Sequence, residues 1–164
     1  MADEVRSAFE AFVREYSTNL LRTSYLLTGD RAAAEDLLQD TFTRLYPRWS
    51  RVMAADAPLA YVRRSLTNEF LMAKRRRTLP LVDVDISADR GWVTDAQDEI
   101  GARDATLRLL RNLGERQRAA VVLRYYLALD DQEIGHLLAC REATVRSLVS
   151  RGLAALRAAE ALVR

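Results

Sequence analysis

The apolar residues of this chain recur at helical spacing, and few residues interrupt the pattern. The 164 residues include only six glycines and three prolines, the two residue types that most often break helices. The first helix is expected over residues 3–28, where the apolar positions form one stripe. The sequence therefore predicts an all-α fold.

Two more helices are expected in the first half of the chain. The second runs over residues 31–49, after Gly29 ends the first helix in a left-handed conformation and Asp30 caps the next. Residues 50–57 are expected to form a loop. The third helix is expected over residues 58–77, since proline is favoured in a first helical turn.

Charge is distributed in three blocks, although the net charge of the chain is only +2. Residues 1–77 carry a net charge of +3, residues 78–102 of −5, and residues 103–164 of +4. Residues 78–102 also lose the helical period, so we expect a flexible acidic linker between two small helical domains. Two basic blocks hint at nucleic-acid binding.

The composition argues against several classes of protein. A single cysteine, Cys140, and a single histidine, His136, exclude an internal disulfide and a Cys/His metal cluster. Because there is no glycine-rich loop either, we expect no enzymatic activity, no cofactor and no small-molecule substrate. Cys140 is expected to pack and His136 to be solvated. Without a signal peptide or an apolar run of about 18 residues, a cytoplasmic protein with no membrane insertion is expected.

The C-terminal block contains a helix-turn-helix pattern. Helices are expected over residues 103–113 and 115–127, followed by a short helix that begins at the D-x-x-E capping box Asp130–Glu133. A three-residue turn, Ala139–Arg141, leads to a longer helix, which in such units enters the major groove. A helical hairpin that only packs has the same spacing. The polar residues left outside can reach phosphates and base edges: Arg141, Glu142, Thr144, Arg146, Ser147 and Arg151.

Three segments resemble one protein family. "LGERQRAAVVLRYYLALDDQEIGHLLACREATVRSLVSRGLAALR" is similar in order and spacing to domain four of the bacterial extracytoplasmic-function sigma factors. "AEDLLQDTFTRLYPRW" resembles the domain-two helix that docks on core RNA polymerase, and "PLAYVRRSLTNEFLMAKRRR" resembles the adjacent helix that engages the −10 promoter element. The resemblance implies sigma domain two over residues 1–77, a linker over 78–102, and domain four, which binds the −35 element, over 103–164.

The resemblance also implies roles for individual residues. Binding to the polymerase clamp helices is expected from Asp36, Gln39, Asp40 and Arg44. Binding to −10 DNA is expected from a polar face and the cationic end of the third helix: Arg63, Arg64, Thr67, Asn68, Lys74, Arg75, Arg76 and Arg77. Binding to −35 DNA is expected from the outward residues of the helix-turn-helix named above. Taken singly, each of these residues also suits an ordinary solvated face.

Two residues of the turn depart from the family pattern. Arg141 stands where a serine or similar residue commonly caps the helix, and arginine cannot cap. Ala139 stands where glycine often makes the turn. These departures predict a less firm start of the last helix, or an added phosphate contact from Arg141.

The aromatic residues are expected in or near the core. This expectation covers Phe42, Trp49, Tyr125 and Tyr126. Trp49 has an alternative role, in which it lines the loop that holds a flipped base.

The expected function is that of a sigma factor, which directs core RNA polymerase to promoters and helps to melt them. The expected partners are the β and β′ subunits of the polymerase and promoter DNA, with an anti-sigma factor as a conceivable third. Two alternatives remain from the sequence alone. A stand-alone helix-turn-helix regulator would bind duplex DNA without polymerase, and an anti-sigma-like or scaffold protein would bind polymerase but no promoter.

Overall fold

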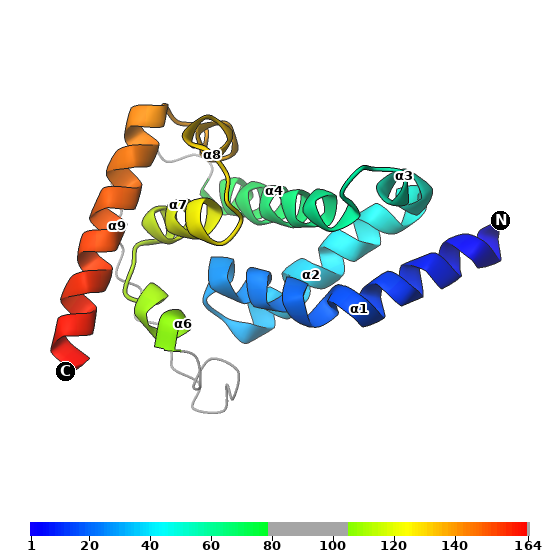
Figure 1. Cartoon of the computed structure of the whole chain (residues 1–164), viewed down its shortest axis with the longest axis horizontal. Helices are drawn as coiled ribbons and strands as arrows, with labels where there is room; N and C mark the ends of the chain where they lie inside the picture. Colours follow the sequence, from blue (N-terminus) through cyan, green and yellow to red (C-terminus); the bar gives the residue numbers. More distant parts are fainter. Residues whose placement is uncertain (79–104, 164) are drawn as a thin grey trace. The chain divides into compact units, whose positions relative to one another are not determined.

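The computed structural model describes residues 1–78 and 105–163, in which all regular structure is helical (Figure 1). The chain divides into two compact units, Met1–Arg77 and Thr78–Arg164. The all-α prediction is thus confirmed for the described residues. Apart from Thr78, the expected linker over residues 78–102 lies outside them.

Unit one contains the helices α1 (Ala2–Thr28), α2 (Arg31–Leu45), α3 (Trp49–Met53) and α4 (Pro58–Thr78). The boundary between α1 and α2 follows local chemistry. Gly29 has a φ of 71°, and its N–H donates to the Tyr25 carbonyl at 2.7 Å. Asp30 accepts a hydrogen bond from the Ala33 N–H at 2.8 Å. Both expectations for this boundary are confirmed.

The core of unit one is built around Trp49, which is fully buried. The rings of Phe9 and Phe12 from α1 each pack edge-on against it, with centroids 4.9 Å away. Aliphatic side chains from all four helices complete this core: Leu20, Leu27, Leu38, Val52, Val62 and Leu66. Trp49 is therefore a core residue, and its alternative role beside a flipped base is wrong.

The second helix is shorter than predicted. It ends at Leu45, and a single 3₁₀ turn, Tyr46–Arg48, leads into α3. Pro47 lies in this turn, and it accounts for the change because proline has no N–H and its ring clashes with the carbonyl four residues earlier. The expected loop over residues 50–57 consequently begins as helix α3.

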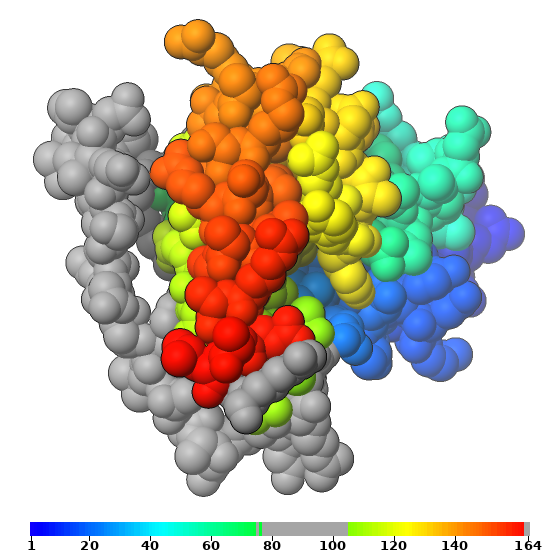
Figure 2. Space-filling model, turned by 60° about the vertical axis from the view of Figure 1, so that its left-hand side comes forward, coloured from blue at the N-terminus to red at the C-terminus, as the bar shows by residue number. Residues whose placement is uncertain are grey.

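Unit two contains α6 (Ala105–Leu110), α7 (Glu115–Tyr125), α8 (Asp131–Leu138) and α9 (Glu142–Val163). Helix α9 packs against the other three helices of the unit, and one face of it remains at the surface (Figures 1 and 2). The core combines side chains from all four helices: Leu107, Leu110, Leu123, Ile134, Val145 and Val149. Gly152 lets α9 approach α7, since a Cβ there would lie 2.8 Å from Cγ2 of Val121.

Two of the predicted helices in unit two extend too far at their C-terminal ends. Helix α6 stops at Leu110, and α7 stops at Tyr125, each shorter than the apolar period suggested. The side chain of Tyr125 is exposed, with a relative accessibility of 62%. The expected core role of Tyr125 is therefore wrong: it is the last residue of α7, and its side chain lies in solvent. None of the described helices combines the length and apolar character that a bilayer crossing requires.

Candidate nucleic-acid and polymerase interfaces

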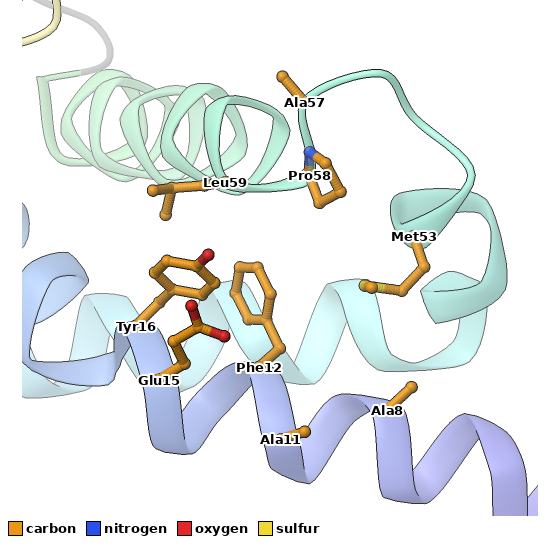
Figure 3. Close-up of a pocket in the computed structure, with 9 residues that line it drawn as sticks. All are labelled: Ala8, Ala11, Phe12, Glu15, Tyr16, Met53, Ala57, Pro58 and Leu59. Carbon is orange, nitrogen blue, oxygen red and sulfur yellow. The ribbon is translucent and has the colours of Figure 1, made fainter.

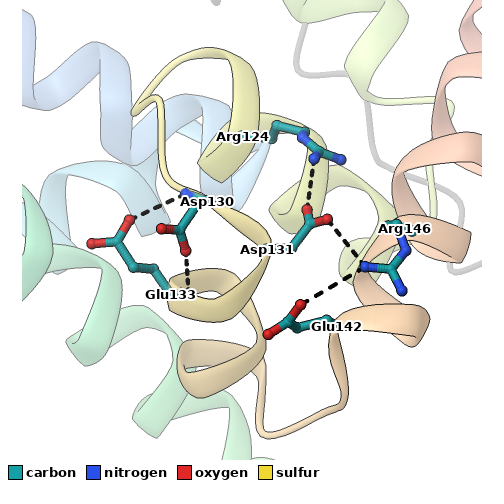
Figure 4. A network of polar contacts seen from close by, with 6 residues as sticks. All are labelled: Arg124, Asp130, Asp131, Glu133, Glu142 and Arg146. Atoms are coloured by element: carbon teal, nitrogen blue, oxygen red, sulfur yellow. Dashed lines mark hydrogen bonds and ion pairs between the residues drawn. The ribbon is translucent and has the colours of Figure 1, made fainter.

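The start of α8 is held by a complete capping box (Figure 4). The carboxylate of Asp130 accepts a hydrogen bond from the Glu133 N–H at 2.8 Å. In return, the Glu133 carboxylate accepts one from the Asp130 N–H at 3.1 Å. Two otherwise unsatisfied donors at the helix start are paired in this way, so the first helix of the helix-turn-helix has a well-defined beginning.

The turn between α8 and α9 is tight. Ala139 adopts a left-handed conformation, with φ 53° and ψ 48°. The Cys140 N–H donates to the Gly135 carbonyl at 3.0 Å, and a Cβ on Gly135 would lie only 2.8 Å from the Cys140 carbonyl oxygen. Glycine at 135 is therefore required by close approach. Ala139 adopts a left-handed conformation that is unfavourable for alanine, at the position where glycine often makes this turn.

The helix α9 separates a buried face from an outward face. Val145, Leu148 and Val149 are buried against unit two. The residues predicted to meet −35 DNA lie outside: Arg141, Glu142, Thr144, Arg146 and Arg151 are exposed, and Ser147 is half-buried. Nη2 of Arg151 donates to Oγ of Ser147 at 2.9 Å, so these two side chains lie together.

An ionic network joins α7, α8 and α9 at this surface (Figure 4). Oδ1 of Asp131 lies 2.7 Å from Nη2 of Arg124, and Oδ2 of Asp131 lies 3.6 Å from Nη1 of Arg146. The same Nη1 lies 3.8 Å from Oε2 of Glu142. One carboxylate thus bridges the end of α7 and the outward face of α9.

The arginines of the segment "ERQR" at the start of α7 have structural roles. Nη2 of Arg116 donates to the Leu138 carbonyl at 3.4 Å, which satisfies an acceptor at the end of α8. Arg118 is buried, and loss of hydration together with the charge of Arg111 lowers its pKa to about 10. Its guanidinium still remains protonated at neutral pH, so unit two contains a buried cation.

In unit one, the outward face of α2 carries the residues predicted to bind polymerase. Asp36, Gln39, Asp40 and Arg44 are exposed there. Ala34, Leu37, Leu38, Thr41 and Leu45 are buried on its opposite face. Nη1 of Arg44 lies 3.1 Å from Oε1 of Glu69 on α4. The predicted polymerase face is thus connected to the helix predicted to bind −10 DNA.

The polar residues of α4 divide between the surface and the interior. Arg64 and Asn68 are exposed, as expected. Thr67 is only 1% exposed, and its hydroxyl donates to the Arg63 carbonyl at 2.9 Å. Nη2 of Arg63 donates to Oδ1 of Asn19 on α1 at 2.6 Å. The placement of Thr67 on the polar surface is wrong, because it shares the face of Arg63 that turns toward α1.

The cationic end of α4 is described in part. Arg76 is exposed, and Nζ of Lys74 lies 5.9 Å from the centroid of the Phe70 ring. The side chains of Arg75 and Arg77 lie outside the described part of the chain.

Unit one also has an open apolar groove of about 350 Å³ between α1, the end of α3 and the start of α4 (Figure 3). Figure 3 shows Phe12 and Tyr16 of α1 side by side, with Leu59 of α4 across the groove from them. A hydrogen bond with Glu15 and the charge of its carboxylate raise the pKa of Tyr16. Within residues 1–78 and 105–163, no group of three or more His, Cys, Asp or Glu side chains is arranged to hold a metal ion.

Comparison with known proteins identifies both units. The sigma-70 region 2 family matches residues 12–79, and the sigma-70 region 4 family matches residues 103–156. The RNA polymerase sigma-E factor of Streptomyces avermitilis is 33% identical over 149 residues, which cover 91% of this chain and 83% of that protein. This chain belongs to the ECF sigma factors of the sigma-70 family.

Two further similarities extend over nearly the whole sigma factor. The ECF sigma factor SigW of Bacillus subtilis is 26% identical over 165 residues, covering 93% of this chain and 88% of that one. The fold resembles the sigma factor RpoE of Bartonella quintana, solved in complex with the anti-sigma factor NepR. That similarity has a TM-score of 0.60 at 22% identity and covers 96% of this chain and 99% of that one.

The family assignment decides the function in outline. A sigma factor is a non-catalytic subunit of RNA polymerase that directs transcription initiation at specific promoters. The predicted family, function and lack of enzymatic activity are therefore confirmed. The stand-alone regulator and the scaffold protein are no longer needed as explanations.

Sequence reasoning missed the residues that support the sigma factor's surfaces. Asn19, which holds Arg63, and Asp131, which lies between Arg124 and Arg146, were not singled out. Asp131 has a local signal, since it occupies the first position of α8 beside the capping residue. Asn19 has none, because its partner lies 44 residues away in the sequence.

Proposed function

We propose that three helices of this sigma factor divide the work of promoter recognition: α2 binds core polymerase, α4 binds the −10 element and α9 binds the −35 element. The observation that carries the proposal is the outward face of α9. Its polar residues lie opposite a buried apolar face, as a helix that enters the major groove requires. The division into two units suits recognition of two separate promoter elements.

The proposed polymerase surface is the exposed face of α2, formed by Asp36, Gln39, Asp40 and Arg44. The exposed carboxylates of Asp36 and Asp40 stand four residues apart on one face, which suits a basic partner surface. The proposed partner is the clamp-helix region of β′, with further contacts to β.

The proposed −10 surface is the exposed side of α4 with its cationic end. Asn68 can hydrogen-bond the edge of an unstacked base, and Arg64 can stack on a base or pair with a phosphate. Lys74 and Arg76, with Arg75 and Arg77 beside them in the sequence, are proposed to bind phosphates. Arg63 is proposed mainly to hold α4 against α1, since Asn19 engages its guanidinium.

The proposed −35 surface combines residues for bases and for phosphates. Arg146 suits guanine and Glu142 suits the amino group of cytosine. Thr144 and Ser147 can bond to either kind of group, whereas Arg141 and Arg151 suit phosphates. Capture of flipped bases at the −10 element then helps to melt the promoter, because it offsets part of the unstacking cost.

Two further aspects are proposed from the family. The complex of the Bartonella quintana sigma factor with NepR supports an anti-sigma factor as a partner class for this chain too. The site of action is proposed to be the cytoplasm, where the polymerase works.

The proposal can be tested by transcription in vitro from a random promoter library, using bacterial core polymerase with and without this protein. New transcripts that share two spaced upstream motifs are expected. Asp40→Ala should weaken binding to core, Asn68→Ala should weaken preference at the −10 motif, and Arg146→Ala should weaken preference at the −35 motif.

Matched controls are available on exposed sites outside the proposed surfaces. Arg157→Ala removes a positive charge from α9 and is the control for Arg146→Ala. Glu10→Ala removes a negative charge from unit one and is the control for Asp40→Ala. If the protein neither binds core nor starts transcription, the proposal is wrong. If all variants behave like their controls, the assignment of the surfaces is wrong.

A further inference from the structure

We propose that Asp131 is a positioning residue that orients Arg146 for reading one base pair of the −35 element. The inference rests on the proposed role of α9 in −35 recognition. Asp131 lies at the start of α8 and does not belong to the outward face of α9. Its role would be exerted through Arg146 and not through a contact of its own with a base.

The carboxylate of Asp131 is itself held in place. Its side chain is only 15% exposed, and Nη2 of Arg124 lies 2.7 Å from Oδ1, a close ion pair that lacks the geometry of a hydrogen bond. The neighbouring capping box between Asp130 and Glu133 fixes the backbone from which it projects. The carboxylate is therefore a stationary charge at the edge of the DNA-facing surface.

Arg146 is restrained from one side only. Its side chain is 57% exposed, and Nη1 faces both Asp131 at 3.6 Å and Glu142 at 3.8 Å (Figure 4). Both ion pairs are made through Nη1, and Figure 4 shows the other guanidinium nitrogens of Arg146 directed away from the two carboxylates. The distances to Nη1 exceed those of hydrogen bonds. The carboxylates thus attract one end of the guanidinium and leave its other nitrogens available.

This arrangement suits base reading better than phosphate binding. A guanine is recognised by two parallel hydrogen bonds from the planar guanidinium, which requires a defined orientation. A side chain restrained before binding loses less rotamer freedom on binding. For a phosphate contact, a fixed acid beside the arginine would only weaken the attraction.

The two possible roles of Asp131 predict different base preferences. In either role, Asp131→Asn removes a negative charge near DNA, so binding to non-promoter DNA should strengthen by about twofold to fivefold at low salt. If the residue only stabilised unit two, the variant would lower the melting temperature and leave all base preferences unchanged. If it positions Arg146, preference at one −35 position should fall.

The experiment uses holoenzyme assembled from core polymerase and the full chain, with a promoter library randomised over the −35 motif. Sequencing of the bound and transcribed DNA gives the preference at each position. Arg146→Ala should reduce preference at one position by about tenfold or more. Asp131→Asn should reduce preference by about threefold to tenfold at that same position, and should have no further effect in the Arg146→Ala background.

Asp130→Asn is the matched control. It removes one negative charge from the adjacent residue, and asparagine caps a helix as well as aspartate does. The control should strengthen non-promoter binding like Asp131→Asn but keep all base preferences. If thermal unfolding shows that Asp131→Asn destabilises the protein, Arg124→Gln offers a second variant. It retains the Asp131 charge but removes its anchor, and it should reduce preference at the same position.

The outcomes separate this inference from the proposed function. If Arg146→Ala changes the base preference at no −35 position, the proposed base contact is wrong, and so is the proposed role of Asp131. If Arg146→Ala reduces preference at one position while Asp131→Asn and Arg124→Gln behave like the control, the base contact stands and only the positioning role is overturned.

Discussion

The two helices proposed to meet DNA use their polar residues differently. On α4, several polar side chains hold unit one together: Arg63 bonds to Asn19 of α1, Glu69 pairs with Arg44 of α2, and Thr67 is buried. On α9, the outward polar side chains lie outside the core: Arg151 bonds to Ser147, and Arg146 pairs with Glu142 and Asp131. Substitutions on α4 should therefore mix effects on folding and binding, whereas those on the outward face of α9 should affect mainly binding.

The largest effect is expected where α4 enters the core. Leu66 is fully buried, so Leu66→Ala should lower the free energy of unfolding of unit one by about 2–5 kcal/mol. Leu162→Ala on α9, whose side chain is almost fully exposed, should change it by less than about 0.5 kcal/mol. Chemical denaturation followed by circular dichroism measures both. Equal losses would contradict the described packing.

A smaller effect on folding is expected from the adjacent arginines of α4. Arg63→Ala removes a charged hydrogen bond between α4 and α1, and should cost about 1.5–3 kcal/mol of stability. Arg64→Ala removes an exposed side chain, so it should leave stability within about 0.5 kcal/mol and weaken −10 binding instead. Thermal unfolding and binding of holoenzyme to fork-junction DNA would separate the two. The comparison between α4 and α9 fails if both arginines affect only binding.

On α9, stability and recognition should separate cleanly. Arg146→Ala removes two long ion pairs of a side chain that is 57% exposed, and Asp131 keeps Arg124 as its partner, so the loss should cost at most about 1 kcal/mol of stability. Its loss should instead reduce discrimination at one −35 base pair by about 1–3 kcal/mol. Competition binding with single-base promoter variants measures this. A melting temperature that falls as far as that of Arg63→Ala would show that α9, too, uses this residue for folding.

The smallest effect, with the opposite sign, is expected in the turn before α9. Ala139 has a positive φ, so Ala139→Gly should stabilise unit two by about 0.5–1 kcal/mol after the greater freedom of unfolded glycine is counted. Ala143→Gly, at an exposed helical position only four residues later, should destabilise by about 1 kcal/mol. Denaturation curves for the two variants test the turn geometry. If both variants were less stable than the original protein, the left-handed conformation of Ala139 would be contradicted.

The sequence by itself determined what depends on neighbouring residues. Helical spacing predicted most of the helices, Gly29 and Asp30 marked the boundary between α1 and α2, and the capping box marked the start of α8. These features could be anticipated because backbone conformation and capping act within a few residues along the chain. The outward positions of α2 and α9 followed for the same reason, since a helix with one apolar face must turn its other face outward.

The tertiary structure decided which polar residues serve the surface and which serve the interior. Thr67 and Arg63 lie on a face of α4 that the local pattern assigned to solvent, but α1 packs there and brings Asn19 to Arg63. Asp131 reaches Arg124 and Arg146 only because α7, α8 and α9 pack together. The physical reason is that a side chain's partner depends on which helices pack together, and residues far apart in the sequence supply those partners.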